Sequence, residues 1–399
     1  MPKYDRRGFL RLTGAAAATS ALASACSGSS LDDSENAGDG GSIKIGLILP
    51  EGGVYKALGD DQRAGWNLYL ELNKKRLGGR DITVVTADES EDAETTKANA
   101  EKLLKKDNCL VVAGMISSAN IIPVQDMFTE AKVPFLSTNA SPGPVQGKKF
   151  GWRSSFKNAD PTLAIAPYMA KNAGGPISMI AANYAAGQDH VKALDQAFKA
   201  AGGKLAGDPI LTPFPMTVSF QPYLKQIEDQ NPKAVYCFFG GADAVKFVKE
   251  YQKFGLSEKY QLFAPGWLTE GGVLNAQGPA AEGILNSLNY SADLDNAANR
   301  KFVAEYQRKN GRAPTSFAVA AYDAGWILDK AIAAAGGDLT SERLEKEIGE
   351  IGQIDSPRGP WEFGEHRSPV QKWYLREVKK DGDVLANVVI DELSTVGID

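Results

Sequence analysis

From residue 43 onward, short apolar runs alternate with segments that carry apolar residues at helical spacing. An uninterrupted apolar run of strand length is typical of a strand covered on both faces. Seven such runs occur, at 43–50, 81–88, 108–115, 133–140, 176–183, 233–241 and 260–267. Helical patterns occupy 57–76, 93–106, 119–131, 160–172, 188–201, 219–230, 242–254, 296–310, 316–335 and 340–349. This alternation predicts βαβ units and parallel sheets.

The strand–helix pattern forms two series, one before about residue 157 and one after it. No long linker separates them, and the segment 150–162 runs from one series into the next. We therefore expect an α/β fold of two similar lobes joined by extended crossings. At the end of the chain, two strand-like runs flank the turn Lys-Asp-Gly-Asp within 371–391 and predict a hairpin.

Composition narrows the functional classes. The chain has 399 residues, enough for two domains, with 44 basic and 49 acidic residues and a net charge of −5. This balance gives no support for nucleic-acid binding, which usually shows a basic patch. After the first 26 residues no apolar run approaches the ~20 residues of a spanning helix.

The first 26 residues have the order of an export signal. Arg6 and Arg7 precede Phe9 and Leu10, and a run of mostly Ala, Thr, Ser and Gly follows up to Cys26. The start resembles a twin-arginine signal and the end resembles a lipoprotein cleavage box, which implies lipidation of Cys26. The alternative is an amphipathic helix with a buried cysteine. Residues 27–42 are rich in Gly, Ser and Asp and predict a flexible tether.

Residues suited to catalysis are few. Neither His190 nor His366 has a second His or a Cys at metal-ligand spacing, and we expect both to be exposed or to cap a helix. Cys109 and Cys237 lie in apolar runs, which favours unpaired core cysteines, although a disulfide between them stays open. No motif supplies a nucleophile, a base or a metal site. We expect no enzyme, no metal and no cofactor.

Several stretches resemble the type I periplasmic solute-binding proteins of the leucine/isoleucine/valine-binding family. They include IKIGLILPEGGVYKALGDDQRAGWNLYLELN, VVAGMISSANIIPVQDMFTEAKVPFLSTNASP, NYAAGQDHVKAL and SFAVAAYDAGWIL, and they follow the family's order and spacing. The resemblance implies two Rossmann-like lobes, joined by three crossing strands, with ligand held in the cleft. Lobe 1 would comprise 43–157 and 290–368, and lobe 2 would comprise 158–289 and 369–399.

The lobe 1 side of the cleft would hold a carboxylate. Ser118 follows the strand 108–115 at a helix start, where a hydroxyl lies beside free N–H groups. Asn139, Ala140 and Ser141 stand at the end of the strand-like run 133–140. By resemblance, Ser118 and Ser141 give hydroxyls to the ligand carboxylate and Asn139 offers its carbonyl. A plain helix cap at Ser118 and an ordinary turn at Ser141 are the alternatives.

The lobe 2 side departs from the family. Leucine-type binders place an acidic residue against the ligand ammonium, and that position aligns with Gly266. A buried ammonium without a counter-charge is costly. The other expected contacts are aromatic or small: Tyr184, Gly240, Trp267 and Phe317. Core packing is the alternative for Trp267, and Asp189, Asp243 or Glu270 could supply the charge from another direction.

The resemblance implies a monomeric, extracytoplasmic receptor of an ATP-driven importer, anchored to a membrane through Cys26. Its partners would be an ABC permease with its ATPase subunits and a small amphipathic carboxylate, such as an aromatic acid. Three alternatives stay open: a branched-chain amino acid as the ligand, a sensing subunit with the same fold, and a secreted hydrolase.

Overall fold

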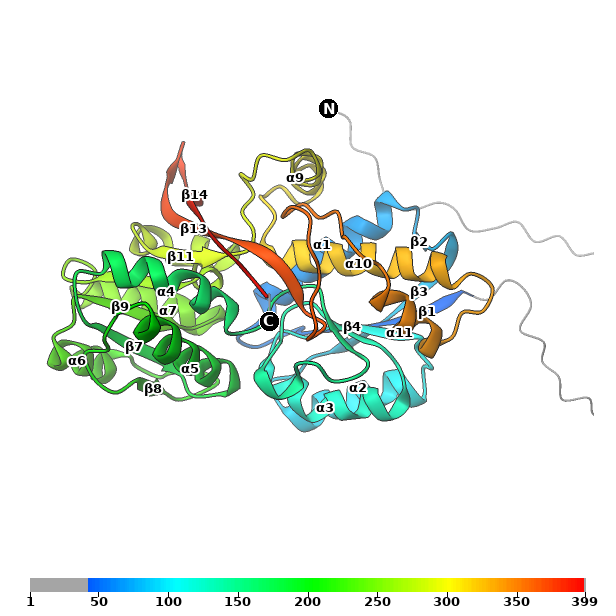
Figure 1. Cartoon of the computed structure of the whole chain (residues 1–399), viewed down its shortest axis with the longest axis horizontal. Helices are drawn as coiled ribbons and strands as arrows, with labels where there is room; N and C mark the ends of the chain where they lie inside the picture. The colour runs from blue at the N-terminus through cyan, green and yellow to red at the C-terminus, as the bar shows by residue number, and fades with distance from the viewer. Residues whose placement is uncertain (1–41, 398–399) are drawn as a thin grey trace, which may run out of the picture. The chain divides into compact units, whose positions relative to one another are not determined.

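The computed structural model describes residues 42–397, which form part of one compact unit. The predicted signal, Cys26 and the predicted tether up to residue 41 lie outside the described residues. Two sheets organise the described chain, and we call the elements packed around each of them lobe 1 and lobe 2 (Figure 1).

The sheet of lobe 1 has the strand order β2-β3-β1-β4-β5-β6, and its pairs are parallel except β2–β3. Its strands are β1 (Ile43–Leu49), β2 (Arg76–Leu77), β3 (Arg80–Asp88), β4 (Val111–Gly114), β5 (Phe135–Ser137) and β6 (Gly151–Arg153). Its helices are α1 (Lys56–Leu72), α2 (Ala93–Lys105), α3 (Ser118–Ala131), α9 (Ala297–Asn310), α10 (Ser316–Ala335) and α11 (Ser341–Gly349), with a 3-10 turn, η1, at Gly143–Val145.

Two separate groups of helices bury the lobe 1 strands. Side chains of α1, α10 and α11 share one apolar cluster with the sheet, and those of α2 and α3 share another. Helices α1 and α10 pack so closely that a Cβ at Gly65 would overlap the backbone of Ala318. Elements far apart in sequence therefore complete this lobe.

The sheet of lobe 2 has the order β12-β13-β11-β10-β9-β7-β8, with β14 paired to β13. Its strands are β7 (Ile177–Ala182), β8 (Ile210–Thr212), β9 (Ala234–Phe238), β10 (Gln261–Pro265), β11 (Leu285–Leu288), β12 (Glu362–Phe363), β13 (Pro369–Asp381) and β14 (Val384–Val396). Its helices are α4 (Asp160–Asn172), α5 (Ala185–Ala200), α6 (Gln221–Gln230), α7 (Gly241–Lys253) and α8 (Gly272–Gln277), with 3-10 turns η2 (Gly266–Thr269) and η3 (Gly278–Ala281).

Three segments connect the lobes: β6 to α4, β11 to α9, and α11 to β13. Buried polar side chains tie these segments together. The Asn289 amide donates to Gln371 Oε1 at 2.8 Å, and the Gln371 amide donates to the Ser155 carbonyl at 2.7 Å. Ser155 and Asn289 lie in the first two segments and Gln371 lies near the start of β13, so hydrogen bonds join the crossings to one another.

The predicted α/β fold with two lobes is correct, and the C-terminal hairpin is present as β13 and β14. The predicted strands contain β1, β4, β5, β7, β9 and β10, and β3 starts one residue earlier than expected. Cys109 and Cys237 are buried free thiols, so the disulfide that the sequence left open does not form.

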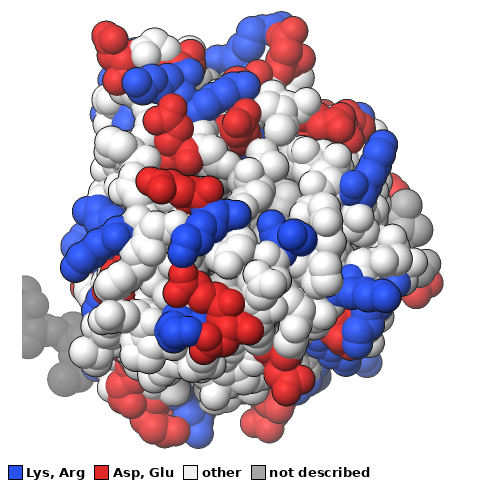
Figure 2. All heavy atoms as spheres, turned by 90° about the vertical axis from the view of Figure 1, so that its left-hand side faces the viewer, with Lys and Arg blue, Asp and Glu red and all other residues white. Residues whose placement is uncertain are grey.

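Two surface properties agree with the composition. On the face shown in Figure 2, Lys and Arg are interspersed with Asp and Glu rather than segregated by sign. Among the described residues, none of the helices is long and apolar enough to cross a membrane.

Candidate ligand-binding site

A cavity lies between the lobes, and the empty space within its outline, including space open to solvent, is about 390 Å³. Both lobes and the first crossing segment contribute to its lining. Its thirteen lining residues are Tyr55, Leu58, Ile116, Ser118, Asn139, Phe156, Asn158, Tyr184, Ala186, Phe238, Gly240, Trp267 and Phe317. Six of these side chains are aromatic and none carries a formal charge, so the cavity suits a small, largely apolar ligand.

Four helices begin at this cavity. Ser118 and Phe317 lie in the first turns of α3 and α10, and Tyr184 and Gly240 are the N-cap residues of α5 and α7. A helix N-terminus carries about half a positive charge and leaves N–H groups without intrahelical acceptors. Acidic side chains already lie at three of these ends: Glu89 accepts the Ser117 N–H at α3, Glu270 accepts the Ser316 N–H at α10, and Asp243 lies in the first turn of α7. The start of α5 has no acidic residue in its first turn and favours an anion.

We call Ser118, Asn139 and Asn158 the polar end of the cavity. The Asn158 amide donates to Ser118 Oγ at 3.1 Å, and the Asn139 amide donates to the Ile116 carbonyl at 2.8 Å. The Ser141 hydroxyl is fully buried and has no hydrogen-bond partner among the described residues. The Ser118 hydroxyl and the second N–H of the Asn139 amide could donate hydrogen bonds to a carboxylate.

Aromatic rings form much of the remaining wall. Phe156 from the first crossing stacks on Trp267 from lobe 2, with ring centroids 4.9 Å apart and planes at 19°. Phe238 and Phe317 also line the cavity. An aromatic ligand would meet ring faces and edges here, and aromatic pairs contribute about 0.5–1.5 kcal/mol beyond the area they bury.

His190 lies behind this wall, and the expectation that it is exposed or caps a helix was wrong. Its side chain is fully buried, stacks on Phe238 at 4.2 Å and meets Trp267 edge-on at 5.5 Å. Its Nδ1 is 2.6 Å from the Thr162 hydroxyl. Burial lowers the pKa of His190 to about 3, so the ring is neutral and packs as an aromatic residue. His366 is exposed in its loop, in agreement with the sequence.

No carboxylate among the described residues lines the cavity. Asp189 accepts hydrogen bonds from Asn158 and from the Gly143 N–H, and Asp243 accepts one from the Thr217 N–H. Burial raises the pKa of both carboxyls. Neither side chain faces the cavity as a counter-charge for a ligand ammonium.

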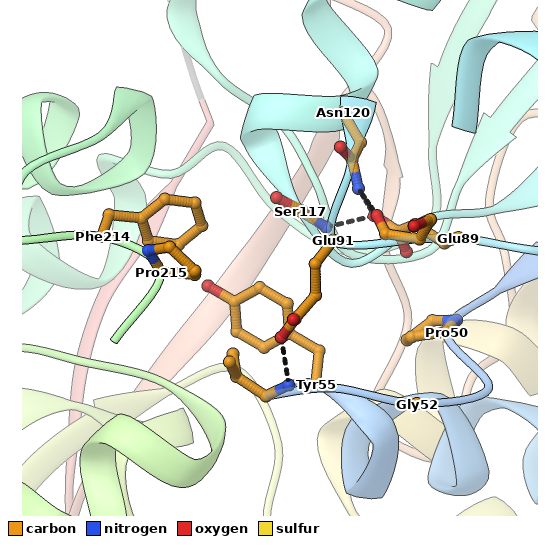
Figure 3. Close-up of a pocket in the computed structure, with 11 residues that line it drawn as sticks. Pro50, Gly52, Tyr55, Glu89, Glu91, Ser117, Asn120, Phe214 and Pro215 are labelled. Carbon is orange, nitrogen blue, oxygen red and sulfur yellow. Dashed lines mark hydrogen bonds between the residues drawn. The ribbon is translucent and has the colours of Figure 1, made fainter. Parts of the chain in front are cut away.

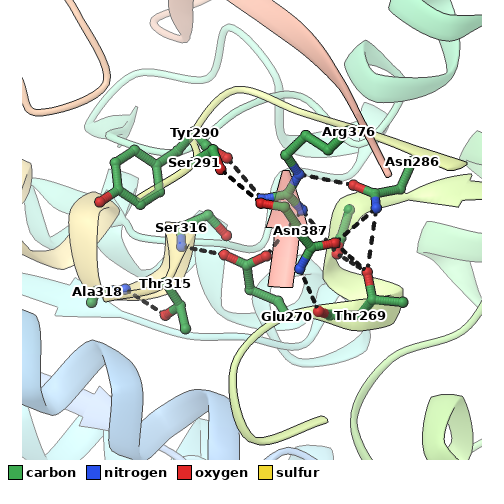
Figure 4. Close-up of polar contacts among 11 residues, drawn as sticks. Thr269, Glu270, Asn286, Tyr290, Ser291, Thr315, Ser316, Ala318, Arg376 and Asn387 are labelled. Atoms are coloured by element: carbon green, nitrogen blue, oxygen red, sulfur yellow. Dashed lines mark hydrogen bonds and ion pairs between the residues drawn. The ribbon is translucent and has the colours of Figure 1, made fainter. Parts of the chain in front are cut away.

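The third acidic candidate, Glu270, is bound elsewhere (Figure 4). Its carboxylate pairs with the buried Arg376 guanidinium at 3.0 Å and accepts the Ser316 N–H at 2.9 Å. A Cβ at Gly266 would collide with that guanidinium and lie 2.6 Å from Leu288 Cβ. Arg376 therefore fills the space beside Gly266, where the family resemblance would put an acidic side chain.

A second cavity adjoins the first and shares Tyr55 with it (Figure 3). The Tyr55 hydroxyl lies 3.1 Å from the Tyr184 hydroxyl, and the Tyr184 ring stacks on Phe214 at 4.1 Å. Glu89 lines this outer cavity and accepts the N–H groups of Ile116 and Ser117 at 2.6 and 2.7 Å. Burial raises the pKa of Glu89 to about 7 in spite of these bonds.

The lobes touch around the cavities. Besides the Tyr55–Tyr184 pair, the Ala242 N–H of lobe 2 donates to the Val54 carbonyl of lobe 1 at 3.2 Å. The Gly143 N–H of lobe 1 donates to Asp189 of lobe 2 at 3.1 Å. The structure is therefore a closed form of the two lobes.

The structure brings six of the nine expected contact residues to the cavity: Ser118, Asn139, Tyr184, Gly240, Trp267 and Phe317. Three of the nine, Ala140, Ser141 and Gly266, are buried next to it without lining it.

Sequence reasoning missed the lining residues Tyr55, Leu58, Ile116, Phe156 and Asn158. Phe156 and Asn158 lie in the segment 150–162, which the sequence already identified as a crossing between the lobes. Residues of such a crossing are candidates for the lining of the cleft. Among the described residues, no group of three His, Cys, Asp or Glu side chains could hold a metal ion.

Known proteins resemble this chain in both sequence and structure. Residues 42–383 match the family model for periplasmic binding proteins. The Leu/Ile/Val-binding protein homolog 6 of Brucella melitensis is 31% identical over 348 residues, covering 86% of this chain and 88% of that protein.

Two solved structures are similar over most of their length. A solute-binding protein of an ABC transporter from R. palustris, in complex with benzoate, is 32% identical with a TM-score of 0.82, covering 90% of this chain and 98% of that one. A second R. palustris solute-binding protein, in complex with 4-hydroxybenzoate, is 28% identical with a TM-score of 0.82, covering 89% and 98%.

Proposed function

The chain belongs to the periplasmic binding protein family, as its resemblance implied, and we propose that it delivers a small aromatic carboxylate to an ABC importer. Benzoate and its hydroxylated derivatives represent the class. The protein would have no catalysis of its own. Its partners would be the permease and ATPase subunits of that importer.

The observation that carries the ligand class is the absence of a charged side chain among the cavity's thirteen lining residues. A zwitterionic amino acid brings an ammonium that would find no counter-charge there, and burying an unpaired ion costs several kcal/mol. A carboxylate alone meets the start of α5 and the polar end of the cavity. The solved R. palustris proteins with benzoate and 4-hydroxybenzoate support the same class.

We propose roles for the expected residues accordingly. Ser118 would donate its hydroxyl to the carboxylate, and Asn139 would contact it from the end of β5. Ser141 would contribute its unpartnered hydroxyl from behind the polar end, next to Ala140. Trp267 and Phe317 would hold the aromatic ring.

The remaining lobe 2 residues would close the site. Tyr184 would cover the ligand through its contact with Tyr55, and Gly240 would leave room beside the Tyr55 ring, which lies 3.5 Å from a Cβ built there. Gly266 would not contact the ligand. Arg376 fills the space beside it, so an acidic side chain cannot occupy this region.

Export and anchoring belong to the same proposal. Arg6 and Arg7 would direct the chain to the twin-arginine route, and Cys26 would carry lipid at the start of the mature protein. The tether to residue 42 would hold a monomeric receptor near the membrane. The family supports an extracytoplasmic location.

A thermal-shift panel tests the ligand class. Benzoate and 4-hydroxybenzoate are compared with leucine, isoleucine and valine, after unfolding and refolding to remove any bound ligand. Ligand at a hundredfold excess over Kd stabilises by about 2.7 kcal/mol. Benzamide is the matched control, because it keeps the ring and lacks the charge. Stabilisation by the branched-chain amino acids alone would refute the aromatic class in favour of the amino-acid alternative.

A further inference from the structure

Asn158 has a constrained position at the polar end of the cavity. Its backbone N–H donates to the Ser141 carbonyl at 3.1 Å, and its side-chain amide lies between Ser118 and Asp189. The amide nitrogen is 3.1 Å from Ser118 Oγ and 3.0 Å from Asp189 Oδ2. Both hydrogens of one NH₂ group therefore have acceptors.

The carboxylate of Asp189 fixes the direction of these bonds. A carboxylate only accepts hydrogen bonds, so the Asn158 amide must present its NH₂ and not its oxygen. The second N–H then occupies a lone pair of Ser118 Oγ. The Ser118 hydroxyl therefore accepts a hydrogen bond through its oxygen and can donate its own proton to a different acceptor. Because Ser118 lines the cavity, that acceptor can be a ligand.

Asp189 also depends on lobe closure. It lies in α5 of lobe 2, whereas Gly143 lies in η1 of lobe 1. The same Asp189 oxygen accepts the Gly143 N–H at 3.1 Å. Opening the lobes would withdraw this oxygen from the Gly143 N–H. It would also part Ser118 of lobe 1 from the Asn158 amide, which lies two residues before α4 of lobe 2.

We propose that Asp189 is a positioning residue that, through Asn158, aims the Ser118 hydroxyl proton at the ligand carboxylate only when the lobes are closed. The inference rests on the proposed aromatic carboxylate and on Ser118 as its contact. Without the Asp189 carboxylate, the Asn158 amide can turn so that its oxygen faces Ser118 and accepts a hydrogen bond from the hydroxyl. Lobe opening thus weakens the site at the same time as it exposes it.

A double-mutant cycle with benzoate and the full chain tests this relay by calorimetry. Asp189→Ala should weaken benzoate binding about tenfold, as expected for one charge-assisted hydrogen bond. In a Ser118→Ala background the same change should cost less than about twofold, because the hydroxyl it aims is absent. Asp189→Asn keeps an acceptor oxygen and should restore most of the affinity.

The matched control is Asp195→Ala. Asp195 lies on the same helix, is about half exposed and pairs with Lys199 four residues on. This variant should bind benzoate as the unmodified chain does. Stopped-flow measurements should place the loss in Asp189→Ala in the dissociation rate, because the contact exists in the closed form.

The outcomes separate the two hypotheses. If Asp189→Ala costs the same factor with and without Ser118, or if Asp189→Asn fails to restore affinity, the relay is wrong and the ligand class stands. If Ser118→Ala leaves affinity unchanged, the assigned contact is wrong and the relay falls with it. If benzoate does not bind at all, the proposed function itself is refuted.

Discussion

Replacing Glu270 with Gln should destabilise the folded protein strongly. The change keeps the shape of the side chain and leaves the Arg376 guanidinium, 1% exposed, without its counter-charge. Removing one partner of a buried ion pair typically costs 3–5 kcal/mol. Arg376 keeps neutral acceptors in Asn286 Oδ1 at 2.9 Å and the Tyr290 carbonyl at 2.8 Å, so we expect the lower end, about 3 kcal/mol (Figure 4).

Equilibrium urea unfolding measures this loss. With a slope of about 3 kcal/mol per molar urea, the midpoint should fall by about 1 M, with the slope unchanged. Glu392→Gln is the control, because Glu392 pairs with Lys372 on the same hairpin at 2.8 Å and both side chains are about half exposed. It should not shift the midpoint measurably, since exposed pairs contribute little.

A double variant refines the reasoning. Adding Arg376→Met to Glu270→Gln removes the orphaned charge and should recover part of the midpoint. The account of a buried pair would be refuted if Glu270→Gln unfolds at the same midpoint as the Glu392→Gln control. Additive losses in the double variant would equally contradict it.

Three further changes probe the wall of the cavity, its buried histidine and the export signal. Trp267→Leu should weaken benzoate binding by about 1 kcal/mol through lost ring contact, whereas Trp267→Phe should retain most of it; equal losses in calorimetry would contradict the aromatic wall. The pKa of His190 is lowered to about 3 in the folded protein, below an unfolded value near 6.5. Folding stability should therefore be lost as the pH falls from 6.5 toward 3. His190→Gln should reduce this loss, measured as the difference between the urea midpoints at pH 7.5 and pH 5. Cys26→Ala should release the protein from the membrane fraction, and unchanged membrane recovery would count against lipidation.

Much of the fold could be predicted because central parallel strands are covered on both faces and appear as apolar runs. Strand β11 escaped notice because two of its four residues are polar and fully buried. Asn286 bonds to Arg376 and Ser287 donates to the Pro161 carbonyl at 2.7 Å, partners 90 and 126 residues away. A sequence pattern does not show such partners, so the polar residues conceal the strand.

In the candidate site, too, some residues could be predicted from local features of the sequence and others could not. Ser118 and Asn139 could be found because strand ends and helix starts are local features, and such ends meet at one edge of a parallel sheet. His190 could not be placed, because the hydroxyl of Thr162 that makes its burial tolerable lies 28 residues earlier. The role of Asn158 could not be predicted, because its partners Ser118 and Asp189 come from two different lobes.

Each lobe combines elements that are far apart in the sequence, and this affects when the chain can fold during synthesis. Helix α10, which covers α1 and the first sheet, and strand β13, which pairs with β11, both come from the last quarter of the sequence. When the ribosome has released only the first 300 residues, neither lobe has its complete core. Folding must therefore await nearly the whole polypeptide, and such distant pairings make it slow, as high contact order does in general. A fragment ending before residue 316 would expose the apolar surface of α1 and should aggregate rather than fold as an isolated lobe.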